Sequence, residues 1–143
     1  MNQNSAIHQY MTSKVATIRE DRNVEDAFRV VEERNFRHLP VVNSSGKLVG
    51  ILSTRDLSNL KMAMDIYGVL DKNYQGMQSL KMSDLMQTNL VTALPDDTIS
   101  MAAELMLKNE VGAILVVNPA DREKIEGILS YVDVLRALSG QLA

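Results

Sequence analysis

The chain has 143 residues, of which 45% are hydrophobic and 23% are charged, and its formal net charge is −3. This size suits a globular domain with its own core, and the acidic balance argues against a nucleic-acid partner or an anionic membrane surface. Cysteine is absent, which excludes disulfides and thiolate chemistry, and no apolar run is long enough to span a membrane. Because the N-terminus lacks a basic region followed by an apolar core, we expect a cytoplasmic protein.

Two halves of the chain repeat one another, apart from a short insertion around residues 119–123. The seven-residue pattern Gly-Ile-Leu-Ser-x-x-Asp occurs at 50–56 and again at 127–133. Since length changes are tolerated at turns, we interpret the chain as two tandem units with a longer hairpin turn in the second. Further matches keep the same order: Met11 with Met86, Thr17 with Thr92, and residues 41–43 with 116–118.

The first half predicts a short helical lead-in over residues 5–11 and a small strand that ends near Thr17. A helix follows, and Asn23 is its predicted N-cap. Two apolar runs, residues 39–42 and 48–52, then predict a hairpin, because an Asn-Ser-Ser-Gly turn signal separates them. A closing helix completes this half.

The second half predicts the same elements in the same order. Its lead-in is residues 83–86, its small strand ends near Thr92, and Thr98 is the predicted N-cap of the helix that follows. The two hairpin strands are residues 113–117 and 125–129, and a closing helix again follows.

One such repeat buries too little apolar surface to be comfortably stable alone, whereas two copies can cover each other's sheets. The predicted fold class is therefore α/β, of the α+β type, with two tandem β-α-β-β-α repeats packed about a pseudo-two-fold axis. The predicted boundaries are 5–60 for the first repeat and 80–138 for the second. Between them, residues 61–79 form a linker that extends the closing helix and contains a loop around residues 71–76.

The Gly-Ile-Leu-Ser-x-x-Asp pattern predicts the end of a buried strand, a serine at the turn and an aspartate in the first turn of a helix. Such a junction gathers free backbone N–H groups and the positive end of a helix dipole, which suits a phosphate. A nearby carboxylate, Asp56 or Asp133, can accept hydrogen bonds from the paired hydroxyls of a ribose. The alternative is purely structural, because Ser-x-x-Asp is close to a capping box, which any helix start could use.

The order of elements, the two Gly-Ile-Leu-Ser-x-x-Asp patterns and the His-Leu-Pro-Val-Val run at 38–42 resemble the CBS-domain family, arranged as a tandem pair called a Bateman module. The resemblance covers nearly the whole chain. It implies a regulatory module that binds an adenosine-containing ligand, such as AMP, ADP, ATP or S-adenosylmethionine, in clefts between the repeats. It also implies a homodimer formed through the closing helices, and a protein partner that responds to ligand occupancy.

The resemblance also implies roles for individual residues. Asp56 and Asp133 match the aspartate that holds the ribose hydroxyls. Positions near the phosphate or the ribose carry hydroxyl or basic residues, and here they are Ser53, Ser130, Arg55, Arg37 and His38. The segments that line the adenine pocket match Thr17, Ile18, Thr92, Ala93, Phe36, Val111 and Gly112.

Similar modules often build each site from both repeats, and the two repeats differ here in charge. Arg37 and His38 stand where the second repeat has Gly112 and Ala113. If the pairing crosses the repeats, the cleft of Asp133 gains both basic residues. We would then expect Asp133→Ala to weaken AMP or ATP binding more than Asp56→Ala does.

Other functions have less support from the residues. No Walker loop, nucleophile elbow, dinucleotide fingerprint or zinc-binding helix pattern is present, so we expect the chain not to be an enzyme. With two histidines and no cysteine, we do not expect a transition-metal site. One alternative stays open, namely a ligand-free scaffold that uses the same fold for dimerisation alone.

Overall fold

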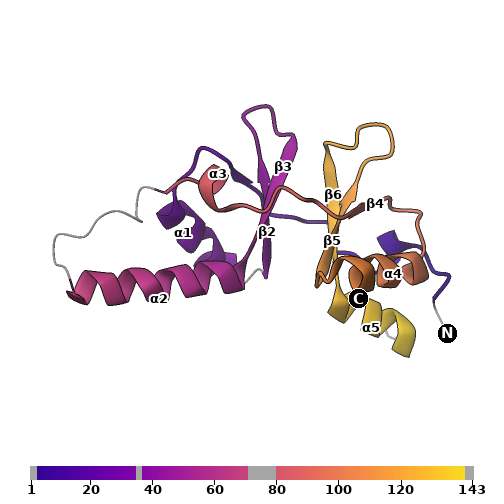
Figure 1. The fold of residues 1–143 in the computed structure, drawn as a ribbon. Helices are drawn as coiled ribbons and strands as arrows, with labels where there is room; N and C mark the ends of the chain where they lie inside the picture. Colours follow the sequence, from indigo (N-terminus) through magenta and orange to yellow (C-terminus); the bar gives the residue numbers. More distant parts are fainter. Residues whose placement is uncertain (1–2, 35–36, 71–79, 141–143) are drawn as a thin grey trace. The chain divides into compact units, whose positions relative to one another are not determined.

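A computed structural model describes residues 3–34, 37–70 and 80–140 (Figure 1). The chain divides into two compact units. The first-repeat unit is Ala16–Thr88, and the second-repeat unit combines Met1–Val15 with Asn89–Ala143. Each unit contains a three-stranded sheet together with helices, so the predicted mixed α/β class is confirmed.

The sheet of the first-repeat unit has the order β1-β2-β3. Strand β1 (Ile18–Arg19) pairs in parallel with β2 (His38–Val42), and β2 pairs antiparallel with β3 (Leu48–Ser53). Helices α1 and α2 contact each other and lie on the same side of this sheet in Figure 1. The helices of this unit are α1 (Val24–Arg34), α2 (Thr54–Leu70) and α3 (Met82–Leu85).

The second-repeat unit has the same topology, with the order β4-β5-β6. Strand β4 (Thr92–Ala93) pairs in parallel with β5 (Ala113–Val117), and β5 pairs antiparallel with β6 (Ile125–Ser130). Helices α4 and α5 pack side by side (Figure 1). The helical elements of this unit are the 3-10 turn η1 (Ile7–Gln9), α4 (Ile99–Asn109) and α5 (Tyr131–Ser139).

The predicted helix caps are confirmed. The side-chain oxygen of Asn23 accepts a hydrogen bond from the backbone N–H of Asp26 at 3.0 Å, and Thr98 Oγ1 accepts one from Met101 at 3.1 Å. One boundary differs from the prediction, because β1 begins at Ile18, just after the position at which the small strand was expected to end. The loop expected around residues 71–76 lies outside the described residues.

The hairpin between β2 and β3 is set by its Asn-Ser-Ser-Gly turn. The side-chain oxygen of Asn43 accepts hydrogen bonds from the backbone N–H groups of Ser45 and Lys47, both at 3.0 Å. Gly46 adopts a φ of 80°, a left-handed conformation that glycine reaches without steric cost. This turn places the start of β2 opposite the end of β3.

The two lead-in segments are exchanged between the repeats. Thr12 exchanges backbone hydrogen bonds with Ile128 of β6, at 2.9 and 3.0 Å, and Gln87 does the same with Ile51 of β3. Each lead-in therefore adds an edge bridge to the strand that carries the other repeat's Gly-Ile-Leu-Ser pattern. This exchange explains why the N-terminal segment belongs to the second-repeat unit.

Each unit has its own hydrophobic core. Leu39 and Val41 of β2 meet Val24 and Ala27 of α1 in the first-repeat unit, and all four side chains are fully buried. Every residue of β5, the central strand of the second-repeat sheet, is buried, and Ile114 and Val116 belong to the core of this unit. Full burial of a large aliphatic side chain contributes about 1.5–3 kcal/mol, so these cores stabilise the strand ends that carry the candidate site.

Candidate ligand-binding site

The junction between β3 and α2 gathers four of the predicted site residues. Ser53 ends β3, and its hydroxyl oxygen accepts a hydrogen bond from the backbone N–H of Asp56 at 3.1 Å. His38 lies opposite Ser53 in the β2–β3 register, and the carbonyl oxygen of Arg37 accepts a hydrogen bond from Thr54 at 2.8 Å. The fold therefore brings Arg37, His38, Ser53 and Asp56 to one edge of the first-repeat sheet.

The pKa of His38 is shifted by its surroundings at this edge of the sheet. Burial lowers the pKa of His38, the positive charge of Arg37 lowers it further, and the carboxylate of Asp56 partly opposes both effects. The lowered pKa favours the neutral imidazole of His38 at neutral pH, within the electrostatic influence of a guanidinium and a carboxylate. Both charged partners are exposed, so a ligand can reach them.

Asp56 opens onto a cleft of about 410 Å³ in the first-repeat unit. Within the described ranges, no group donates a hydrogen bond to its carboxylate. An apolar cleft of this size with a few polar groups is typical of a small-molecule site. Four leucines line the cleft, joined by the polar side chains of Asp56, Asn59 and Gln87; the leucines are Leu52, Leu57, Leu60 and Leu85.

At the matching junction between β6 and α5, the aspartate is buried and hydrogen-bonded within the protein. Asp133 is only 6% exposed, and one of its carboxylate oxygens accepts hydrogen bonds from the N–H and the hydroxyl of Ser130 at 2.9 and 3.0 Å. In return, the Asp133 N–H donates to the Ser130 hydroxyl oxygen at 3.3 Å, and Arg136 lies 3.6 Å from the other carboxylate oxygen. This is a complete capping box, the structural arrangement that the sequence allowed as the alternative to ligand binding.

The loop before β5 lies beside that capping box. Gly112 accepts a hydrogen bond from the Tyr131 N–H at 2.9 Å through its carbonyl oxygen, and Ala113 lies opposite Ser130 in the strand register. Val111 packs against the core of the second-repeat unit. This loop therefore adds small and apolar groups near Ser130, in contrast to Arg37 and His38 in the first repeat.

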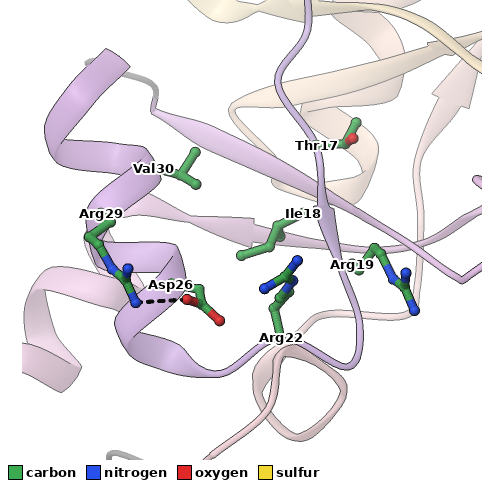
Figure 2. A pocket seen from close by; sticks show the side chains of 7 residues that line it. All are labelled: Thr17, Ile18, Arg19, Arg22, Asp26, Arg29 and Val30. Atoms are coloured by element: carbon green, nitrogen blue, oxygen red, sulfur yellow. Dashed lines mark hydrogen bonds and ion pairs between the residues drawn. The ribbon is translucent and has the colours of Figure 1, made fainter.

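The remaining predicted residues are spread over other positions. Thr92 and Ala93 form β4, and Ala93 is part of the core. Arg55 is exposed in the first turn of α2, and Phe36 lies outside the described residues. Thr17 and Ile18 line a second cleft, together with three arginines of the first-repeat unit (Figure 2).

Two polar residues of the Asp56 cleft were missed in the sequence. Asn59 follows Asp56 by three positions, so both lie on one face of α2, and this spacing could have identified it. Gln87 comes from the exchanged lead-in, and no pattern in the sequence points to it. In the ranges that the structure describes, there is no cluster of three or more histidine, aspartate or glutamate side chains that could hold a metal ion.

Comparison with known families matches a CBS-domain model to residues 7–62 and again to residues 82–140. The chain belongs to the CBS-domain family. The two matched segments correspond to the two sequence repeats, so the chain holds a pair of CBS domains, as the repeated motif predicted. None of the helices in the described ranges is both long and apolar enough to cross a membrane.

Curated relatives of this CBS-domain chain are longer proteins. It is 31% identical over 94% of its length to a homoserine O-acetyltransferase of Methanococcoides burtonii, of which it spans 24%. It is 30% identical over 95% of its length to an uncharacterized protein of Methanocaldococcus jannaschii, of which it spans 48%. The chain therefore spans about a quarter to a half of these relatives.

Solved CBS-domain structures share the fold. A crystal structure of CBSX2 in complex with AMP is 25% identical, with a TM-score of 0.73 and coverage of 94% of this chain and 96% of that one. A Methanocaldococcus jannaschii protein is 29% identical, with a TM-score of 0.78 and coverage of 96% of this chain and 49% of its own. The first of these structures shows that a protein with this fold holds an adenine nucleotide.

Proposed function

We propose that this CBS-domain pair is a regulatory module that binds an adenosine-containing ligand and passes ligand occupancy to a partner protein. The observation that carries the proposal is the cleft beside Asp56, which combines apolar walls with an exposed carboxylate. The AMP complex of CBSX2 supports the choice of an adenosine-containing ligand.

The proposed pose places the ribose against Asp56, because a carboxylate accepts hydrogen bonds from two neighbouring hydroxyls. Asn59 and Gln87 line the same cleft and supply amide donors and acceptors. Arg37 is exposed at the adjoining strand end, where a guanidinium binds a phosphate through charge-assisted hydrogen bonds. Arg37 therefore favours AMP, ADP or ATP over S-adenosylmethionine, whose sulfonium is positively charged.

Catalysis is not part of this proposal. The acetyltransferase name belongs to a protein of which this chain spans 24%, so that activity is not transferred to the chain. The rival proposal is a ligand-free scaffold in the cytoplasm, and the capping box at Asp133 favours it for the second repeat. Both proposals share the fold, and they differ in whether any ligand binds.

A thermal-shift panel of adenosine, AMP, ADP, ATP and S-adenosylmethionine tests this difference, with guanosine nucleotides as matched controls. A ligand at about 100 times its Kd stabilises the folded state by about 2.7 kcal/mol, which raises the melting temperature by several degrees. The regulatory proposal expects such a rise for at least one adenosine compound and a smaller rise for its guanosine counterpart. An unchanged melting temperature across the whole panel would favour the scaffold.

A further inference from the structure

The second cleft of the first-repeat unit differs in character from the cleft of Asp56. It has a volume of about 420 Å³ and lies beside β1 and the start of α1. Arg19, Arg22 and Arg29 line it, with Asp26 as the single carboxylate in the lining. The two clefts share no lining residue, so the second one can be tested independently.

Two of the three guanidinium groups form ion pairs with carboxylates. Arg19 forms two hydrogen bonds to the carboxylate of Asp21, at 2.7 and 3.1 Å, and Arg29 forms an ion pair with Asp26 at 2.9 Å. Arg22 has no side-chain partner among the residues that the structure describes. Among the described residues, Arg22 is therefore the one guanidinium of this cleft that forms no ion pair with a carboxylate.

The backbone holds Arg22 in place. Its N–H donates to the carbonyl oxygen of Arg19 at 3.1 Å, and its own carbonyl oxygen accepts a hydrogen bond from Met82 at 2.8 Å. On the other side of the turn, Val24 donates to the carbonyl oxygen of Leu80 at 2.8 Å. The turn between β1 and α1 is thus fixed by the segment that leads into α3, and a ligand at Arg22 would not have to order it.

The charges are spread along the cleft. In Figure 2 the side chains of Arg29, Asp26 and Arg22 follow one another, with Arg22 directed toward Ile18, whereas Arg19 lies across the β1 backbone and points away from them. Ile18 and Val30 add apolar surface and no hydrogen-bonding side-chain groups. This arrangement suits an elongated anion with several charged oxygens, because each guanidinium can bind a phosphate through two parallel hydrogen bonds.

We infer that this cleft binds a linear oligophosphate, with Arg22 as the main contact and Arg29 as the second. The oligophosphate is either free or the tail of a nucleotide, since both present the same chain of phosphate oxygens. Thr17 and Ile18, which line this cleft, were also predicted to line the adenine pocket, so both sources have to be tested.

Titration calorimetry with inorganic triphosphate at low ionic strength tests the inference. We expect one triphosphate to bind per chain, and Arg22→Gln to weaken this binding about tenfold. Arg22→Lys should cause an intermediate loss of affinity, because lysine keeps the positive charge but cannot donate two parallel hydrogen bonds to one phosphate. Asp26→Asn should act in the opposite direction and tighten binding, because it removes the carboxylate of the cleft. The matched control is Arg122→Gln, which removes one arginine from the exposed β5–β6 turn and should leave the affinity unchanged.

Two results would overturn the inference: no binding of triphosphate, or an equal loss for Arg22→Gln and Arg122→Gln, which would indicate a diffuse charge effect. Unchanged thermal unfolding of Arg22→Gln confirms that this variant is folded. ATP that displaces triphosphate and depends on Arg22 identifies a nucleotide tail, whereas ATP that does not compete identifies a free oligophosphate. Adenosine, which has no phosphate, tests the proposed function separately, because the cleft of Asp56 can bind it whether or not triphosphate binds.

Discussion

The two copies of the Ser-x-x-Asp motif differ at the residue that follows the aspartate by three positions. This residue is Arg136 in the second repeat, where it lies 3.6 Å from Asp133, and Asn59 in the first repeat. A guanidinium at this position supports a buried, fully bonded carboxylate. In the first repeat, where this position holds an amide, Asp56 is exposed at the edge of a cleft. The aspartate of the second repeat therefore has a basic neighbour one helical turn along, and the aspartate of the first repeat does not.

The first prediction follows from this contrast. Asp133→Ala should lower the free energy of unfolding by about 1 kcal/mol, because it removes the capping carboxylate from the N-terminus of α5. Asp56→Ala should change it by less than about 0.5 kcal/mol, since the Asp56 side chain is exposed. Denaturant unfolding of the two variants measures both values. Equal losses would show that the two carboxylates have the same structural role.

The second prediction concerns pH. Because the pKa of His38 is lowered in the folded state, the unfolded chain takes up this proton more readily as the pH falls through the ordinary value of 6.5. The contribution of neutral His38 to stability is therefore present above that pH and is lost below it. We expect His38→Gln to flatten this part of the pH dependence of unfolding, and His8→Gln, at an exposed position, to retain it. An unchanged pH dependence in His38→Gln would contradict the proposed burial of the imidazole.

At the scale of elements, the glycine of each repeated motif makes room for the exchanged lead-in. A Cβ at Gly50 would collide with the side chain of Met86, and a Cβ at Gly127 would lie 2.6 Å from the sulfur of Met11 and 2.9 Å from the carbonyl oxygen of Thr12. The methionine can move, whereas the backbone oxygen is held by a hydrogen bond to Ile128. The two glycines therefore differ in how far a substitution can be accommodated.

The third prediction uses this difference. Gly50→Ala and Gly127→Ala should each destabilise their unit by about 1–3 kcal/mol through overpacking, with the larger loss at Gly127. Adding Met86→Ala should relieve part of the loss at Gly50, and adding Met11→Ala should relieve less of the loss at Gly127. Gly68→Ala is the control, because its Cβ meets nothing within 4 Å and alanine favours the helix by about 0.5–1 kcal/mol. Rescue of both glycine variants to the same extent would contradict the role of the Thr12 carbonyl.

The sequence predicted the order of elements and the helix caps because these depend on local patterns of apolar residues, turns and capping side chains. It did not predict the exchange of the lead-ins, since the repeat alignment does not say which strand edge each lead-in joins. For the same reason Gln87 was missed in the cleft of Asp56. The different states of Asp56 and Asp133 also require tertiary contacts, although Asn59 and Arg136 were visible in the sequence.

At the scale of the whole molecule, several large apolar side chains remain exposed on helices. Those of the first-repeat unit lie on α2, and those of the second-repeat unit lie on α4 and α5. Exposed apolar groups of this kind are typical of surfaces that become covered on association. The most exposed of them are Met62 and Ile66 on α2, Leu107 on α4, and Leu135 on α5.

The fourth prediction is that the chain forms a homodimer through these helices. Sedimentation should give a mass of about twice 15.9 kDa at micromolar concentration, because a two-fold assembly covers the same surface on both copies. Leu135→Glu should shift the equilibrium toward the monomer, whereas Lys124→Glu, in the exposed β5–β6 turn, should not. A single species of 15.9 kDa for the unaltered chain would count against dimerisation.

The central claim is that an adenosine-containing ligand binds at Asp56, and calorimetry with AMP on three proteins tests it most directly. The unaltered chain should bind AMP, Asp56→Ala should weaken binding by about ten- to a hundredfold, and Asp133→Ala should retain most of the affinity once its folded fraction is measured. The reverse result, with binding lost in Asp133→Ala and intact in Asp56→Ala, would contradict the claim. It would favour instead the site predicted from the sequence, in which Asp133 joins Arg37 and His38 across the repeats.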